Sequence, residues 1–267
     1  MSRVTVIMGI YNCAKTLGES LDSLFFQTFN DWNLIMCDDG STDDTYAVAE
    51  KYRLANPARI RLIKNDHNLG LNHTLNRCLE IADGEYIARH DGDDISLPER
   101  FEKEVKALDL HPEIAIVSTV MTYFDESGIW GQSRSIEFPQ KNDFIKGTPF
   151  CHGPAMVRRE AYQNVGGYTV DKKLLRVEDY DLWIRMYAAG YRGMNLSDPL
   201  YSMRDDRNAC SRRKFKFRVN EFRVRINAAR TLSLPLRAYL YSFRPIIVGM
   251  MPRWLYMKFH KKRLGIN

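Results

Sequence analysis

Strand and helix patterns alternate four times in the first 110 residues of this chain, and this alternation restricts the fold more than any other feature. Short apolar runs at residues 4–8, 32–37, 60–63 and 86–88 have the length and composition of buried strands. Between the first two runs, apolar residues recur at helical spacing at Leu17, Leu21, Leu24 and Phe25. Such alternation is typical of an α/β domain with a Rossmann-like, mainly parallel sheet flanked by helices.

Polar residues follow the ends of three of these strands. Asn12 comes after the first strand, Asp38 and Asp39 after the second, and Asp91 and Asp93 after the fourth. Open α/β sheets bind ligands at the carboxyl ends of their strands, so we expect these side chains at one edge of the sheet. A carboxylate such as Asp39 can accept hydrogen bonds from a base or from sugar hydroxyls. Capping of the following helix is the alternative.

The segment after the fourth strand is strongly acidic, because it places Asp91, Asp93 and Asp94 around Gly92. Carboxylates this close repel each other unless a cation lies among them. Magnesium or manganese is the natural partner, since these ions prefer oxygen ligands and often share a site with substrate phosphates. A solvated turn that caps the next helix is the alternative interpretation.

Glu178 and Asp179 fall in the first turn of a later predicted helix. The helix dipole favours carboxylates there, so capping is one interpretation. The other is a general base, which needs burial or a neighbouring carboxylate to raise its pKa; Glu178 and Asp181 could do this for Asp179.

Two single residues are further candidates. His152 lies in a segment of apolar and small residues and is either structural or part of a site. Arg204 follows an apparent strand at residues 200–203 and could offset diphosphate charge. An exposed arginine at the start of a basic tail is the alternative for Arg204.

In their order and spacing, these segments resemble the inverting glycosyltransferases of family 2, which have the GT-A nucleotide-sugar fold. The resemblance extends over about residues 3–205. It is carried by residues 6–12, 38–43, 68–70 with Asn76, 84–87, 91–94 and 178–183.

The resemblance implies a donor site. Tyr11 and Asp39 would contact the uracil of a UDP-sugar, and Asp91 would contact the ribose or the metal shell. Asp93 would bind manganese or magnesium on the diphosphate, and Arg204 would lie near the same phosphates.

The resemblance also implies an acceptor side. Asp179 would be the base that deprotonates the acceptor hydroxyl, and Glu178, His152 and Trp183 would lie near the acceptor or the diphosphate. The reaction would be a single displacement that inverts the anomeric carbon.

Two positions differ from the pattern of many relatives. Gly9 and Ile10 stand where a proline is common, and Asp205 and Asp206 follow Arg204 where a histidine is common. The loop after Arg204 is therefore not expected to supply a third metal ligand.

Charge divides the chain unevenly. Residues 211–267 hold 15 Lys and Arg but one acidic residue, Glu221, for a net charge of +14, whereas the remainder has −8. We therefore expect a transferase domain at residues 1–210 and a basic amphipathic helical tail at residues 211–267. Basic and aromatic residues together suit an anionic membrane surface. The alternatives are nucleic acid binding and a helical appendage packed on the acidic body.

The remaining sequence features indicate a cytoplasmic location. The first strand begins at once, without a signal peptide, and no apolar run is long enough to span a membrane. We interpret the five cysteines, which show no zinc pattern, as reduced thiols; they are Cys13, Cys37, Cys78, Cys151 and Cys210.

These features together predict a peripheral enzyme on the inner face of the cytoplasmic membrane. It would transfer a hexose to a lipid-diphosphate-linked glycan in bacterial surface polysaccharide synthesis, such as O-antigen or capsule. A non-catalytic nucleotide-sugar or nucleic-acid binding protein with the same fold is the competing hypothesis.

Overall fold

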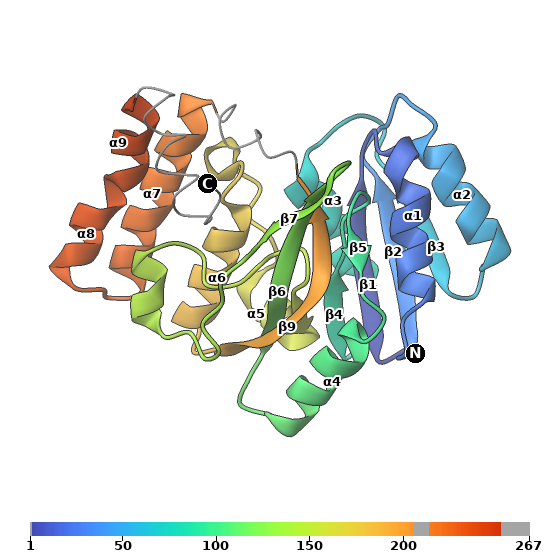
Figure 1. Ribbon diagram of the computed structural model, residues 1–267, viewed down its shortest axis with the longest axis horizontal. Coiled ribbons are helices and arrows are strands. Elements are labelled where there is room, and N and C mark those ends of the chain that lie inside the picture. Colours follow the sequence, from blue (N-terminus) through green and yellow to red (C-terminus); the bar gives the residue numbers. More distant parts are fainter. Residues whose placement is uncertain (1, 206–213, 252–267) are drawn as a thin grey trace.

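The computed structural model describes residues 2–205 and 214–251 and contains one sheet with helices on both faces (Figure 1). The strands lie in the order β3-β2-β1-β4-β8-β6-β9-β5, and β7 pairs with β6 beside this path. The strands are β1 (Val4–Ile10), β2 (Trp32–Asp38), β3 (Ile60–Lys64), β4 (Tyr86–Arg89), β5 (Ile95–Ser96), β6 (Ile116–Asp125), β7 (Gly128–Gln132), β8 (Met156–Arg158) and β9 (Gly193–Arg204).

The first four strands are parallel neighbours, as the alternating pattern predicts. Helices α1 (Ala14–Phe25), α2 (Thr45–Ala55) and α3 (Leu71–Ile81) connect them. Ile10 at the end of β1 pairs with Asp38 at the end of β2, and Ile7 pairs with Arg89 at the end of β4. The carboxyl ends of these strands therefore meet at one edge, which gathers the polar residues that follow them.

The second half of the sheet is mixed. Strand β8 is antiparallel to both β4 and β6, whereas β9 is parallel to β6 and antiparallel to β5. The predicted α/β class is confirmed, and the uninterrupted parallel pairing is confined to the β3-β2-β1-β4 half.

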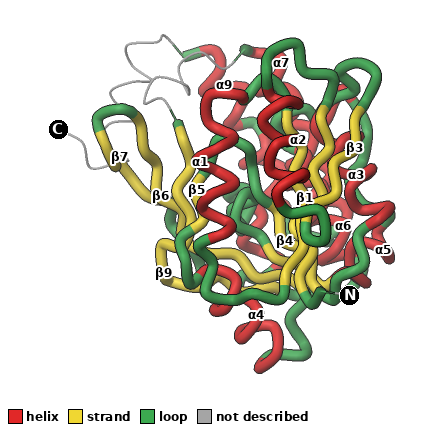
Figure 2. The backbone as a smooth tube through the Cα atoms, turned by 90° about the vertical axis from the view of Figure 1, so that its right-hand side faces the viewer, coloured by secondary structure: helices red, strands yellow, loops and turns green. Residues whose placement is uncertain are grey.

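Alternate residues of β1 contribute to different cores, because successive side chains of a strand point to opposite faces. Val4, Val6 and Met8 belong to the core that contains residues of α1, α2 and α4 (Arg100–Leu110). Ile7 belongs to the core that contains residues of α3, α5 (Arg159–Val165) and α6 (Glu178–Ala188). Figure 2 shows α1 and α2 together over one face of β1 and β3.

Helix α7 (Phe215–Thr231) of the basic segment packs on the body, and α8 (Leu236–Ser242) and α9 (Arg244–Met250) lie outside it (Figure 1). Val224, Ala228 and Ala229 of α7 are buried in the same core as α6. Arg225 donates hydrogen bonds to the carbonyl oxygens of Ile145 and Lys146, at 2.9 and 3.0 Å. These carbonyls lie at the end of η1 (Lys141–Ile145), so α7 is attached to the body by both apolar and polar contacts.

Within residues 2–205 and 214–251, no helix combines the length and apolar character needed to cross a bilayer. Several residues named above lie outside the described part of the chain: Asp206, Cys210, and the basic and aromatic positions at 252–267.

Candidate active site

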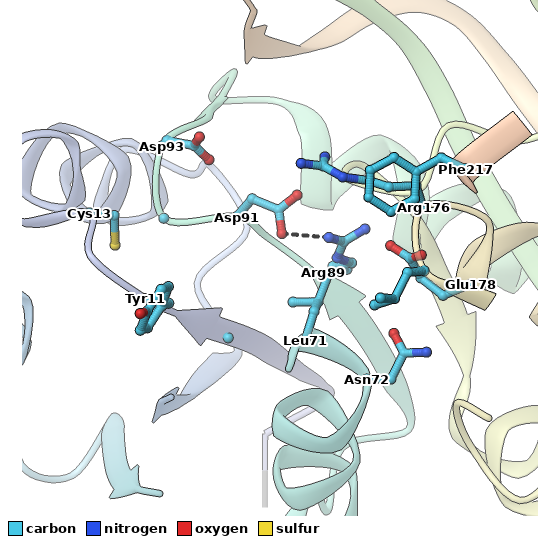
Figure 3. Close-up of a pocket in the computed structure, with 13 residues that line it drawn as sticks. Tyr11, Cys13, Leu71, Asn72, Arg89, Asp91, Asp93, Arg176, Glu178 and Phe217 are labelled. Atoms are coloured by element: carbon cyan, nitrogen blue, oxygen red, sulfur yellow. Dashed lines mark ion pairs between the residues drawn. The ribbon is translucent and has the colours of Figure 1, made fainter. Parts of the chain in front are cut away.

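A cavity of about 520 Å³ opens at the carboxyl ends of β1 and β4, where the sequence predicts the site (Figure 3). Its residues come from four parts of the chain: the end of β1, the acidic segment after β4, the start of α3, and the region where α6 meets α7. They are Gly9, Tyr11, Cys13, Leu71, Asn72, Arg89, Asp91, Gly92, Asp93, Leu175, Arg176, Glu178 and Phe217.

Asp91 and Asp93 both line this cavity but have different partners. The guanidinium group of Arg89, which is buried, pairs with Asp91 at 2.8 Å. Burial and the charge of Asp91 raise the pKa of Asp93. Asp94 is buried behind them, and its burial together with both neighbouring carboxylates raises its pKa to about 8. The acidic segment is therefore a region of excess negative charge, as expected from its sequence.

Arg204, at the end of β9, holds the acidic segment in place. Its backbone N–H donates to Asp94 Oδ1 at 2.9 Å, and its Nε donates to the carbonyl oxygen of Asp93 at 3.2 Å. Its Nη2 forms an ion pair with Glu19 of α1 at 2.5 Å. Arg204 thus lies beside the predicted metal-binding residues, although it does not line the cavity itself.

Two buried residues, Ser20 and His90, fix the backbone of the acidic segment through hydrogen bonds. Ser20 Oγ donates to the carbonyl oxygen of Asp91 at 2.8 Å and lies 3.0 Å from His90 Nε2. The hydroxyl has one proton, so Nε2 of His90 is the donor in the second contact. Burial and Arg100 keep the pKa of His90 well below its usual value. Neither residue was predicted, because an isolated serine and histidine carry no pattern in the sequence.

Gly92 allows the acidic segment to approach α1. A Cβ atom at this position would lie 2.9 Å from Cys13 Sγ and 3.2 Å from a methyl group of Ile10. A larger residue would push the segment, and with it Asp91 and Asp93, away from β1.

Tyr11 lines the cavity, whereas Asp39 is not among the lining residues and makes protein contacts. Asp39 is buried and accepts hydrogen bonds from the backbone N–H groups of Leu69 and Gly70 and from Asn65 Nδ2, at 2.7 to 2.9 Å. Asp39 therefore fixes the loop that leads into α3. Its contact with a base remains a prediction.

Glu178 and Asp179 begin α6, and Glu178 lies on the side of the cavity away from Tyr11 (Figure 3), whereas Asp179 is not among the lining residues. Glu178 lines the cavity, and its Oε2 is among the buried side-chain oxygens that lack a hydrogen-bond partner in the described chain. Burial and the charge of Glu178 raise the pKa of Asp179 to about 6, against the opposing effect of Arg89. A carboxylate with such a pKa is a suitable general base near neutral pH.

Asp181, expected as a second neighbour that raises the pKa of Asp179, is engaged elsewhere. It pairs with Arg185 Nε at 2.8 Å and accepts a hydrogen bond from Thr169 Oγ1 at 2.9 Å. These contacts anchor α6, so Glu178 is the carboxylate that influences Asp179.

His152 and Trp183 lie outside the cavity lining. His152 Nε2 lies 2.8 Å from the hydroxyl of Tyr168, and burial keeps its pKa well below the usual value. Trp183 is fully buried and packs edge-on against His152 and Phe150. His152 therefore contacts α6 from the core, through the ring of Trp183, which belongs to that helix.

Arg176 and Phe217 line the cavity without having been predicted as site residues. Arg176 has a positive φ of 70°, which is unusual for a residue with a side chain and often occurs at functional sites. Phe217 comes from α7, in the basic segment. Figure 3 shows the two side chains together on the side of the cavity that includes Glu178.

In the described part of the chain, no three His, Cys, Asp or Glu side chains are grouped closely enough to hold a metal ion by themselves. The carboxylates of the cavity lining that could take part in such a site are Asp91, Asp93 and Glu178.

Sequence comparison relates the chain to sugar transferases. The family model for glycosyl transferase family 2 matches residues 5–166, and the model for glycosyl transferase family group 2 matches residues 86–259. The chain is 44% identical to a putative glycosyltransferase, EpsE of Bacillus subtilis, over 98% of its own length and 94% of the relative's. It is 30% identical to the amylovoran biosynthesis glycosyltransferase AmsE of Erwinia amylovora, over 96% and 99% of the two chains.

A more distant relative has a name that specifies both substrates. The chain is 27% identical to the Escherichia coli enzyme WfaP over 84% of this chain and 86% of the relative. WfaP is described as a UDP-Glc:α-D-GlcNAc-diphosphoundecaprenol β-1,3-glucosyltransferase.

Solved structures share the fold. Residues 1–349 of S. aureus TarS, crystallised with UDP-GlcNAc, match with a TM-score of 0.70 at 20% identity, over 95% of this chain and 78% of that one. The mannosyltransferase PcManGT of Pyrobaculum calidifontis, in complex with GDP-Man and Mn²⁺, matches with a TM-score of 0.67 at 20% identity, over 98% and 80% of the two chains.

Proposed function

This chain belongs to glycosyl transferase family 2 and has the GT-A fold, and on that premise we propose that it moves a sugar from a UDP-sugar to a hydroxyl group of a lipid-diphosphate-linked glycan. Its relatives include enzymes of polysaccharide biosynthesis. The observation that carries the proposal is the placement of Asp91, Asp93 and Glu178 around one cavity, with Asp179 beside Glu178.

The donor would occupy the β1 side of the cavity, between Tyr11 and the acidic segment. Tyr11 offers a half-exposed ring against which a base can stack. The choice of UDP rests on the name of WfaP, whose donor is UDP-Glc, and on TarS, which was crystallised with UDP-GlcNAc.

Asp91 and Asp93 would hold a manganese or magnesium ion on the donor diphosphate. Such ions are usually bound by one or two carboxylates together with substrate phosphates and water, so two carboxylates in one cavity fit this arrangement. The Mn²⁺ in the PcManGT complex supports the same choice. When bound, this ion would stabilise the negative charge that develops on the leaving diphosphate.

Asp179 would remove the proton from the acceptor hydroxyl. The acceptor oxygen then attacks the anomeric carbon from the face opposite the diphosphate, the bond from this carbon to the diphosphate oxygen breaks, and UDP leaves with the electron pair. Burial and Glu178 give Asp179 a pKa of about 6, so it is ionised and ready to accept a proton at neutral pH. The single displacement inverts the anomeric configuration.

The acceptor would lie on the side of Glu178, Arg176 and Phe217. An aromatic ring can pack on the apolar face of a sugar, and an arginine can pair with phosphate. The diphosphoundecaprenol-linked sugar in the name of WfaP supports an acceptor of this class. The enzyme would then work at the inner face of the cytoplasmic membrane, in the synthesis of a surface polysaccharide such as O-antigen or capsule.

A panel of UDP-sugars with a lipid-diphosphate-linked sugar acceptor, read by mass spectrometry, tests this function. We expect a product one sugar heavier that requires manganese or magnesium and disappears when a chelator is added. Binding of UDP with manganese but no product from any donor would favour the competing hypothesis of a non-catalytic nucleotide-sugar binding protein. Salt-sensitive binding of oligonucleotides, unchanged by Asp93→Ala, would favour a nucleic-acid binding protein.

A further inference from the structure

The outer face of α8 and α9 carries a stripe of exposed apolar side chains, which we call the apolar stripe. It consists of Leu236, Leu240, Phe243, Ile247 and Met250, which are 78, 72, 50, 61 and 74% exposed. Their spacings of four, three, four and three residues place them on one side of a helix, since a helix turns once in about 3.6 residues. Phe243 has helical backbone angles (φ −74°, ψ −15°), so α8 and α9 present one nearly continuous face.

The two helices are attached to the body through small residues. Ala238, Ser242 and Pro245 are buried, and α8 and α9 both contact α7. The large apolar side chains therefore face outward and the small ones inward, which is the reverse of an ordinary surface helix. This distribution is typical of a helix that lies in a membrane interface.

The charge beside the apolar stripe is positive. Arg237 and Arg244 lie on α8 and α9 next to the stripe and are exposed. The exposed basic residues of α7 and the residue before it are Lys214, Lys216, Arg223 and Arg230. Between residues 214 and 251 the one acidic residue is Glu221, which is paired with Arg225 and Arg218 at 3.0 and 3.6 Å. Within the described residues Arg237 and Arg244 form no ion pair, and an apolar stripe beside such arginines complements an anionic lipid surface.

We propose that the apolar stripe inserts into the headgroup region of an anionic membrane, with Arg237 and Arg244 paired to lipid phosphates. The stripe also has a defined relation to the cavity. A Cβ atom on Gly249 of α9 would lie 3.0 Å from the ring of Phe215, and Phe217, two residues further along α7, lines the cavity. Because α9 packs beside the start of α7, docking of the stripe would bring this part of α7, which carries Phe217, near the membrane. This orientation rests on the proposed function, since it matters only for a lipid-linked acceptor.

Co-sedimentation of the full chain with vesicles tests the apolar part of this surface. We expect binding to phosphatidylglycerol vesicles, weaker binding to phosphatidylcholine vesicles, and partial loss with salt. Leu240→Ser/Ile247→Ser should lower binding at least ~10-fold, because two large apolar side chains no longer leave water. The matched control is Leu54→Ser/Leu110→Ser, whose wild-type residues are as exposed (64 and 66%) but lie elsewhere, and it should bind like the wild type.

A second pair of variants tests the charge. Arg237→Glu/Arg244→Glu should lower binding to phosphatidylglycerol by about 25-fold or more at low salt, since each basic residue contributes about fivefold. Lys51→Glu/Lys106→Glu makes the same charge change at exposed positions on α2 and α4 and should have a much smaller effect.

Two further measurements separate the outcomes. Calorimetric binding of UDP with manganese should be the same for the stripe variant and the wild type, which shows that the variant is folded. Vesicle binding that follows the expected pattern in a protein that transfers no sugar would support this surface and contradict only the proposed function. Equal vesicle binding by stripe and control variants would overturn the inference. So would sedimentation velocity showing a wild-type dimer that becomes monomeric in the stripe variant, because the stripe would then be an interface between two copies.

Discussion

Asp91 and Asp93 line the same cavity, yet substitution of Asp91 should also disturb the fold, whereas substitution of Asp93 should not. Asp91 is paired with Arg89 at 2.8 Å, so removing it would also leave a buried guanidinium group without its partner. Asp93 lines the cavity (Figure 3), and its backbone carbonyl oxygen accepts a hydrogen bond from Arg204 Nε. Asp93 is therefore the better position for testing the metal site without disturbing the fold.

We predict that Asp93→Ala abolishes turnover and manganese-dependent UDP binding, because the diphosphate loses the cation that offsets its charge. The temperature of thermal unfolding should be nearly unchanged or slightly higher, since a carboxylate that is repelled by the charge of Asp91 is removed. Asp31→Ala, at an exposed carboxylate before β2, is the matched control and should keep full activity. Turnover that survives Asp93→Ala, or is insensitive to a chelator, would contradict a metal role.

Turnover should depend on the ability of Asp179 to accept the proton of the acceptor hydroxyl. We predict that Asp179→Asn retains UDP-sugar binding but lowers kcat at least ~100-fold, because the amide fills the same space and cannot accept the proton. Steady-state kinetics with both substrates saturating measures this loss. If affinity for the donor falls and saturated turnover does not, Asp179 is a binding or capping residue.

The pH dependence gives an independent test of the same residue. A base works only after losing its own proton, so kcat should rise with pH through an apparent pKa of about 6. Glu178 raises this pKa by its negative charge, so Glu178→Gln should shift the rise toward lower pH. A profile that does not move in Glu178→Gln would mean that another group titrates.

The sequence could predict which residues lie near one another only where those residues follow neighbouring strands. Tyr11, Asp91 and Asp93 line the cavity because the ends of β1 and β4 meet at one edge of the sheet. The sequence could not identify His90 or Ser20, whose roles depend on contacts between residues 70 and 71 positions apart in the chain.

At the level of elements, Arg100 at the start of α4 connects this helix to the end of β4, just before the acidic segment. This buried guanidinium group donates to the carbonyl oxygen of Arg89 and to Ser96 Oγ, both at 2.8 Å, and pairs with Glu104 at 3.2 Å. We predict that Arg100→Leu lowers the free energy of unfolding by about 3–5 kcal/mol, because Glu104 is left as a buried charge without its partner. Chemical denaturation measures the change.

Arg53→Leu is the matched control for Arg100→Leu. Arg53 also pairs with a glutamate on its own helix, Glu50 at 2.6 Å, but near the surface of α2. Water screens this pair, so its loss should change stability little. If both substitutions lower the free energy of unfolding by a similar amount, the burial of the Arg100–Glu104 pair does not determine its contribution to stability.

The net charge of residues 211–267 does not distinguish the part of this segment that packs on the body from the part that is exposed. The composition of residues 211–267 predicted one basic segment, and the structure divides its described part into a packed helix and an exposed face. Leu234 and Ala238 are buried in the core that also contains α6. Truncation from residue 234 onward would therefore expose core residues, and the surface substitutions at 240 and 247 are the cleaner test of membrane binding.

At the scale of the whole molecule, the cavity is completed by residues from opposite ends of the chain. The sheet edge formed by β1 and β4 supplies the predicted donor side, and the start of α7 adds Phe217 on the other side. The sequence predicted the first part because strand alternation determines it. It could not predict the second, because the docking of α7 depends on apolar and polar contacts with α6 and η1, distant in sequence.

This division of the cavity leads to a prediction for α7. Phe217→Ala should raise KM for the glycan acceptor and leave the affinity for UDP unchanged, because the ring lies with Glu178 and Arg176 on the side away from Tyr11 (Figure 3). Phe222→Ala is the matched control, since this half-buried ring on the same helix packs against Phe243 at 5.0 Å and does not line the cavity. Kinetics with the acceptor varied and calorimetry with UDP make the comparison. Equal losses of donor and acceptor affinity in Phe217→Ala would place this ring at the donor instead, and the acceptor would then have to enter the cavity by another side.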